Sequence, residues 1–256
     1  MRWRSFVAVG DSFTEGLDDI YPDGTYRGWA DLVAGQLAAA AAPDGFAYAN
    51  LAVRGRLFPH VVAEQVPAAS AMKPDLVSFA AGGNDVLRRN FDPYALVERF
   101  DAVVGELRGV GADVVLFRFA DVTARLPGQR IIAPRIAVLN REVEATAERH
   151  GAMLVDLFSD DEFGNPALWS ADRLHLATAG HRRVAGRVLA TLGVAYDPQW
   201  LAAAHRAVPP RWLTARVADA RWAGQHLAPW IKRRLTGTSS GDAITPKRPL
   251  LSPFTE

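Results

Sequence analysis

The sequence predicts an α/β fold built on a parallel sheet with helices on both faces. Short apolar runs alternate with longer amphipathic stretches along the first 192 residues. The runs are short and mainly apolar, which is typical of strands that are buried on both faces. Strands that alternate with helices in this way indicate a parallel sheet, and ligands of such sheets bind outside the carboxyl ends of the strands.

Five strands and five helices follow from this pattern, taken in order along the chain. The strand segments are short and rich in β-branched or aromatic residues, and the helical segments are longer and amphipathic. The expected strands are 6–10, 47–51, 76–80, 114–119 and 153–157. The expected helices are 28–42, 58–71, 93–110, 136–150 and 178–192.

Length and composition are those of an ordinary globular protein. Of its 256 residues, 49% are apolar and 22% are charged, and the net charge of +1 gives no global attraction to nucleic acid. The absence of cysteine excludes disulfides, thiolate nucleophiles and cysteine-based zinc sites. The first apolar run is too short for a signal peptide, and no stretch approaches the roughly 20 apolar residues of a membrane span. We therefore expect a soluble, cytoplasmic protein.

The chain changes in character near residue 197. Residues 200–235 hold four of the seven tryptophans and seven basic residues against one acidic residue, a local charge of +6. We expect a core domain over 1–196, a Trp/Arg-rich helical extension over 197–236 that packs on the core, and a loosely ordered tail over 237–256. Two other roles for residues 200–235 stay open, which are contact with a membrane surface and binding of a partner.

Four loops at or near the expected strand ends carry unusual polar clusters. They read GDS at 10–12, NLAVRG at 50–55, GGND at 82–85 and DRLH at 172–175. Because the carboxyl ends of parallel strands meet at one edge of the sheet, we expect the four loops to share one crevice. A serine, a glycine, an asparagine and an Asp/His pair are the groups that an acyl-transfer site needs.

These residue types predict nucleophilic catalysis. Ser12 is the candidate nucleophile, because its hydroxyl becomes reactive once a base removes its proton, and His175 is the candidate base. Asp172, three residues earlier, can hold the imidazole in the correct tautomer. The candidate oxyanion donors are the backbone N–H groups of Ser12 and Gly55 and the side-chain amide of Asn84.

Other interpretations of the same loops remain open. Ser12 and Glu15 have the spacing of a helix capping box, which would use the hydroxyl for backbone bonds. Asn84 also suits a turn after two glycines. Asp11 and Asp85 compete for the role of the carboxylate behind the histidine. The sequence contains no H-E-x-x-H metal motif, no phosphate-loop glycine pattern and no G-x-S-x-G elbow, so we expect no metal and no cofactor.

GDSFTEG, NLAVRG, GGND and DRLH, in this order, resemble the four blocks of the SGNH (GDSL-type) hydrolases, from about residue 5 to residue 192. The resemblance implies a three-layer α/β/α, flavodoxin-like fold with a five-stranded parallel sheet in the order 2-1-3-4-5. It also implies a metal-independent serine esterase or lipase with Ser12 as nucleophile, His175 as base and Asp172 orienting the base. Gly55 and Asn84 would complete the oxyanion hole. The family pattern does not extend over residues 197–256.

Three functions are consistent with these observations. The first is hydrolysis of a small-molecule carboxylic ester through an acyl-enzyme on Ser12, with no nucleic-acid partner. The second is an acyltransferase that passes the same acyl group to an alcohol or a sugar. The third is a binding module that has kept the fold without the activity. No pattern in the sequence indicates the acyl chain, the alcohol or an oligomeric state.

Overall fold

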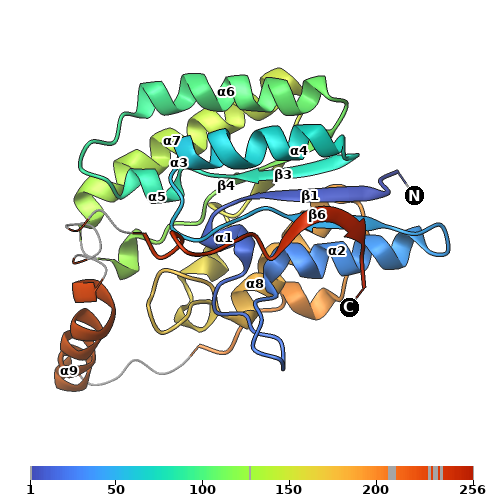
Figure 1. Ribbon diagram of the computed structural model, residues 1–256. Helices are drawn as coiled ribbons and strands as arrows, with labels where there is room; N and C mark the ends of the chain where they lie inside the picture. Colours follow the sequence, from blue (N-terminus) through green and yellow to red (C-terminus); the bar gives the residue numbers. More distant parts are fainter. Residues whose placement is uncertain are drawn as a thin grey trace.

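Six strands form one sheet at the centre of the computed structural model, and helices cover both of its faces (Figure 1). The structure describes residues 2–126, 128–206, 212–229, 232, 236 and 239–255. The strands are β1 (Ser5–Gly10), β2 (Ala47–Asn50), β3 (Leu76–Ala80), β4 (Asp113–Arg118), β5 (Met153–Asp156) and β6 (Arg248–Pro253). The three-layer α/β fold class expected from the sequence is confirmed.

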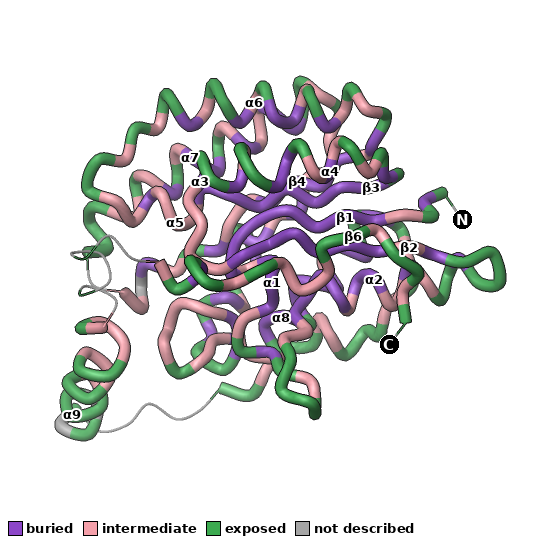
Figure 2. Tube along the Cα trace, viewed as in Figure 1, coloured by how far each residue is buried: buried purple, intermediate pink, exposed green. Residues whose placement is uncertain are grey.

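The first five strands run parallel, and β1 lies between β2 and β3. Their order is the expected 2-1-3-4-5, and each strand matches its predicted range to within one residue at either end. Along β1, Phe6 and Ala8 join the core on one face of the sheet, whereas Val7 and Val9 join the core on the other. Burial of both faces, visible in Figure 2, explains why the strand sequences are mainly apolar.

The helices divide between the two faces of the sheet. One face is covered by α2 (Gly28–Ala41) and α8 (Thr178–Leu192). The other is covered by α3 (Phe58–His60), α4 (Val66–Met72), α6 (Pro93–Gly109) and α7 (Gln129–His150). The remaining short helices of the core, α1 (Ser12–Glu15) and α5 (Gly83–Val86), follow β1 and β3 directly.

Two helices differ from the prediction. The expected helix over 58–71 is α3 and α4 joined by a π-helical turn over Val61–Gln65. The side chain of Gln65 in this turn accepts from the N–H and donates to the C=O of Gly10, both at 2.9 Å, which satisfies the end of β1. Helix α7 begins at Gln129, seven residues earlier than expected, because Pro134 removes only one backbone donor and the helix continues through it.

The tail contains a strand that the sequence did not predict. Strand β6 pairs antiparallel with β2, so the sheet has six strands and is not wholly parallel. The expectation of a loosely ordered tail over 237–256 is therefore wrong for residues 248–253. Strand β2 would otherwise form the sheet edge, and β6 pairs its exposed backbone groups. Lys247, directly before β6, anchors the strand through an ion pair of 2.9 Å with the buried Asp31.

The segment expected as a helical extension over 197–236 contains η5 (Pro198–Leu201), α9 (Trp212–Trp222) and η6 (Ala223–Leu227). Trp200 packs against the core, whereas Trp212 on α9 is 70% exposed. Outside the described residues lie Trp230, Arg211, Arg233 and Arg234. In the part of the chain that the structure describes, every helix is too short or too polar to cross a membrane.

Candidate active site

Ser12 lies just beyond the end of β1, as the first residue of α1. The side chain of Asp11 accepts a hydrogen bond of 3.1 Å from the N–H of Phe13, so Asp11 caps this helix. Glu15 does not return to the start of the helix, because its carboxylate accepts from the backbone N–H of Arg54 at 2.6 Å and from the guanidinium. The capping-box interpretation of Ser12 and Glu15 is therefore wrong.

The Ser12 hydroxyl instead faces His175, which lies in the loop before α8. Ser12 Oγ is 3.0 Å from His175 Nε2, and His175 Nδ1 is 2.5 Å from Asp172 Oδ2. A neutral imidazole bonded to a carboxylate at Nδ1 carries its proton there, so Nε2 is the acceptor that faces the hydroxyl. The fold thus brings a hydroxyl, an imidazole and a carboxylate into line from opposite ends of the core.

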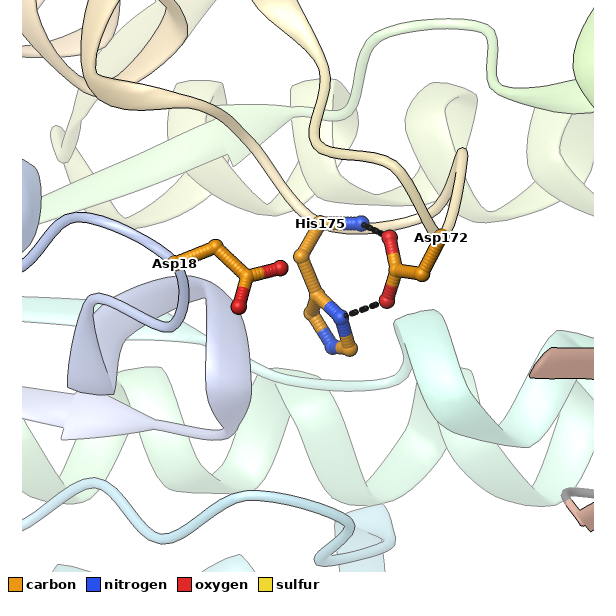
Figure 3. Close-up of side chains that lie close together, drawn as sticks. All are labelled: Asp18, Asp172 and His175. Carbon is orange, nitrogen blue, oxygen red and sulfur yellow. Dashed lines mark hydrogen bonds and ion pairs between the residues drawn. The ribbon is translucent and has the colours of Figure 1, made fainter. Parts of the chain in front are cut away.

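The carboxylate of Asp172 also builds the loop that carries the imidazole. Its Oδ1 accepts from the backbone N–H groups of Leu174 and His175, both at 2.9 Å, and from Ser170 Oγ at 2.7 Å. Figure 3 shows the two bonds from His175 to Asp172. Arg173 has a φ of 66°, in the left-handed region, which closes the turn. One side chain therefore sets both the turn and the orientation of the ring.

The charges of this pair stabilise one another. Burial alone would raise the pKa of Asp172, but the hydrogen bonds and the charge of His175 outweigh it and hold that pKa well below its usual range. Burial would likewise lower the pKa of His175, yet Asp172, and to a smaller degree Asp18 and Asp11, raise it above its ordinary 6.5. The site favours an imidazolium once the ring has taken up a proton.

Asp18 is a third carboxylate at the imidazole, which the sequence analysis did not identify. It points toward the ring from the side opposite Asp172 (Figure 3), and its φ is 67°. Asp18, Asp172 and His175 each offer a ligand atom within 4.8 Å of the others, as a cation site would. Both ring nitrogens already have partners, so we interpret Asp18 as part of the electrostatic surroundings of the ring. No local pattern separates Asp18 from Asp19, whose carboxylate binds Arg27.

Asn84 lies on α5, at the end of β3, and its amide faces the same crevice. Its Nδ2 donates to Asp11 Oδ2 and to the carbonyl of Arg56, both at 3.0 Å. Burial raises the pKa of Asp11, the carboxyl that accepts from Asn84, to about 6. Asp11 therefore supports Asn84 and the helix start, whereas the carboxylate bonded to His175 is Asp172.

Gly55 is placed at the margin of the site. It is not among the described residues that line the cavity with Ser12 and Asn84. Its φ is 72°, and a Cβ there would lie 2.3 Å from Ser239 Oγ, so only glycine suits the position. The Gly55 carbonyl accepts a bond of 3.2 Å from Ser239, while Arg54 before it is held by Glu15. These long-range supports have no local signal in the sequence.

An apolar cavity of about 120 Å³ opens beside the aligned side chains. Ser12, Asn84 and His175 lie in its wall, and Asp11 and His181 are further polar residues of the lining. Most of the remaining wall is aromatic or aliphatic and includes Phe13, Phe119, Ile136, Leu139, Phe163 and Trp169. Such a surface, with a few convergent polar groups at one end, suits a hydrocarbon chain attached to a polar reacting group.

The neighbouring polar residues have structural partners. Asp85 accepts a bond of 2.9 Å from the N–H of Phe58 and so fixes the start of α3. His181 Nδ1 accepts from the N–H of Trp29 at 3.2 Å, and Nε2 bonds the carbonyl of Leu17 at 2.9 Å. Burial lowers the pKa of His181 to about 4, so this ring stays neutral and connects α8 to the loop after α1.

A three-layer α/β fold with a hydroxyl, an imidazole and a carboxylate in line at the strand ends has the arrangement found in serine hydrolases. The comparison with protein families agrees, because residues 8–183 match the GDSL-like lipase/acylhydrolase family. The match covers more than half of the chain, and the chain belongs to this family. It is a hydrolase that acts on esters.

Solved structures of the same fold include three whose chains are covered almost completely. TesA is 28% identical with a TM-score of 0.57, over 73% of this chain and 97% of TesA. LAE5, an alpha/beta hydrolase from the metagenome of Lake Arreo, Spain, is 25% identical with a TM-score of 0.63, over 74% of this chain and 95% of LAE5. Axe2, an acetylxylan esterase from Geobacillus stearothermophilus, is 22% identical with a TM-score of 0.62, over 78% of this chain and 98% of Axe2. This likeness shows a shared fold. No curated protein matches the sequence.

Proposed function

We propose that the protein hydrolyses carboxylic esters through an acyl-enzyme on Ser12. The observation that carries this proposal is the line from Ser12 Oγ to His175 Nε2, at 3.0 Å, and from His175 Nδ1 to Asp172 Oδ2, at 2.5 Å. A serine hydroxyl is a weak nucleophile until a base within hydrogen-bond reach takes its proton. His175 is in that position, and Asp172 holds the proton of the neutral imidazole on Nδ1.

The proposed reaction has two halves with the same proton carrier. Ser12 Oγ attacks the ester carbonyl carbon while its proton passes to His175 Nε2, and the imidazolium then gives this proton to the departing alcohol oxygen. Water next attacks the acyl-enzyme, giving its proton to His175. The ring returns that proton to Ser12 as the carboxylic acid leaves.

The oxyanion of the tetrahedral intermediate needs hydrogen-bond donors that are already in place. We assign this role to the backbone N–H groups of Ser12 and Gly55 and to the Asn84 amide. Both amide hydrogens of Asn84 have partners, Asp11 and the carbonyl of Arg56, so the oxyanion would take one of them over. The Gly55 N–H is the less direct candidate, because this residue does not line the cavity among the residues described.

Hydrolysis of p-nitrophenyl butanoate, with and without a chelator, tests the proposal. Wild-type protein is expected to release p-nitrophenol at the same rate in both conditions. Ser12→Ala should lower kcat by several orders of magnitude, since the members of such a set act as a unit. An undiminished rate in a folded Ser12→Ala protein would refute the assignment.

The acyltransferase alternative shares every step up to the acyl-enzyme and differs only in the acceptor. Product analysis with a competing alcohol separates the two, because transfer yields a new ester and hydrolysis yields only the acid. The cytoplasmic location and contact of residues 200–235 with a membrane surface stay predictions, which cell fractionation and vesicle co-sedimentation would test.

A further inference from the structure

A second cavity, of about 340 Å³, adjoins the candidate active site. Its wall shares Leu87, Leu174 and His175 with the first cavity, so the two spaces meet at the imidazole. It also contains Asp172 but, among the residues described, neither Ser12 nor Asn84. This space, which we call the outer chamber, therefore borders the proton carrier without enclosing the nucleophile.

One wall of the outer chamber comes from the core and the other from the C-terminal segment. Leu126 and Ile132 form the core side, and Trp222 and Leu227 form the opposite side. The family match ends at residue 183, so this second wall lies beyond the matched part of the chain. Figure 1 shows α9, which ends at Trp222, beside the body of the fold.

The C-terminal wall is attached to the loop that carries the imidazole. Trp222 Nε1 donates to the backbone carbonyl of Asp172 at 3.0 Å. The Arg173 guanidinium lies 4.8 Å from the centre of the Trp222 ring and forms an ion pair of 2.8 Å with Asp219. These three contacts hold Trp222 next to the site, so the outer chamber is a built space and not a chance gap.

The chemistry decides which part of the substrate enters this chamber. In ester cleavage the imidazolium gives its proton to the departing oxygen, so that oxygen must lie at His175 Nε2. The group attached to that oxygen then extends from His175, whereas the acyl chain extends from the carbon bonded to Ser12. The first cavity contains Ser12 and Asn84 and suits the acyl chain. Of Ser12, Asn84 and His175, only His175 is among the described residues that line the outer chamber.

We propose that the outer chamber binds the alcohol part of the ester and that this part is an apolar group of several carbons. Leu126, Ile132, Trp222 and Leu227 offer it an apolar surface, and Gln225 and His226 are the polar residues contributed by the C-terminal wall. The proposal rests on the ester hydrolysis proposed above and adds its alcohol specificity. Trp222 and Leu227 are specificity-determining residues in this account.

Two ester series at constant leaving-group chemistry test the proposal. Methyl, butyl and hexyl butanoate vary the alcohol, and methyl acetate, butanoate and hexanoate vary the acyl chain, with acid release followed by titration. For wild-type protein we expect kcat/KM to rise by about fourfold per methylene of the alcohol until the chamber is filled. A flat alcohol series in an active enzyme would overturn the proposal.

The informative variant is Leu227→Ala, because Leu227 lines the chamber and lies outside the loop that carries His175. It should lower the ratio of kcat/KM for hexyl over methyl butanoate by about tenfold and leave the acyl series unchanged. Trp212→Ala is the matched control, since Trp212 is an exposed apolar residue of the same segment that does not line the chamber. It should leave both series unchanged.

The outcomes separate this inference from the function on which it rests. A Leu227→Ala effect on the acyl series alone would place the acyl chain in the outer chamber and overturn the proposal. Equal effects of Leu227→Ala and Trp212→Ala, or none from either, would overturn it as well. If wild-type protein hydrolyses no ester, or Ser12→Ala is fully active, the proposed function itself fails and the inference falls with it.

Discussion

The Asp172 carboxylate has two separable tasks, and one substitution divides them. Its Oδ2 bonds His175 Nδ1, whereas its Oδ1 accepts three bonds that build the loop. In Asp172→Asn the amide oxygen can keep the position of Oδ1 and its donors. The amide nitrogen then replaces Oδ2 and donates to Nδ1, so the imidazole proton moves to Nε2. A protonated Nε2 cannot accept the proton of Ser12.

The structure therefore predicts a large loss of activity and a small loss of stability. With the ring in the wrong tautomer, kcat should fall by roughly 10⁴-fold, which is about 5.5 kcal/mol of transition-state stabilisation. The three bonds at Oδ1 become neutral but persist, so the free energy of unfolding should fall by only about 1–2 kcal/mol. Steady-state kinetics on p-nitrophenyl butanoate measure kcat, and thermal unfolding of the same samples measures the change in stability.

Asp18→Asn is the matched control, because Asp18 faces the same imidazole without occupying Nδ1. It should change kcat by less than about tenfold, since it removes a charge and leaves the tautomer alone. A folded Asp172→Asn protein with kcat within tenfold of wild type would refute the reasoning. So would equal losses in Asp172→Asn and Asp18→Asn.

Three further predictions concern the imidazole, the oxyanion hole and the strand of the tail. Because His175 must be neutral to accept a proton and its pKa is raised above 6.5, kcat/KM should fall as pH drops through that raised value. Asp18→Asn should move this acidic limb to lower pH, and an unmoved pH–rate profile would contradict the account. Asn84→Ala should lower kcat by roughly 10²–10³-fold with little change in KM, and a change in KM alone would remove Asn84 from the oxyanion hole. Lys247→Met leaves the buried Asp31 without its cation, so the free energy of unfolding measured with denaturant should fall by about 3–5 kcal/mol. Adding Asp31→Asn should restore most of this loss. An unchanged unfolding midpoint in Lys247→Met would show that Lys247 does not anchor β6.

The core of the fold was predictable because its signals are local. Each of the five parallel strands is a short, mainly apolar run, since both faces of the sheet are covered by helices, and the polar loops at their ends stand out against that background. The serine, the asparagine and the Asp-x-x-His pair could be recognised for the same reason. The structure brings these four side chains to one crevice, as the rule for parallel sheets requires.

The features that escaped prediction depend on contacts between distant parts of the chain. The Ser12–Glu15 spacing is that of a capping box, but the side chain of Asp11 caps the helix and the Glu15 carboxylate accepts from Arg54 instead. Strand β6 contains two prolines and little strand propensity, and it forms because the edge of β2 is available and Lys247 anchors it. The wall formed by Trp222 and Leu227 lies in a basic, Trp-rich segment. The composition of this segment indicated only packing on the core, contact with a membrane surface or binding of a partner.

Covalent labelling tests the central claim most directly, because an activated hydroxyl reacts where an ordinary serine does not. Wild-type protein, which has several other serines, is treated with an alkyl organophosphonate and digested for mass spectrometry. The account predicts a single adduct on Ser12, and its near absence in His175→Ala, which lacks the base. Adducts spread over other serines, or undiminished labelling of Ser12 in folded His175→Ala, would contradict it.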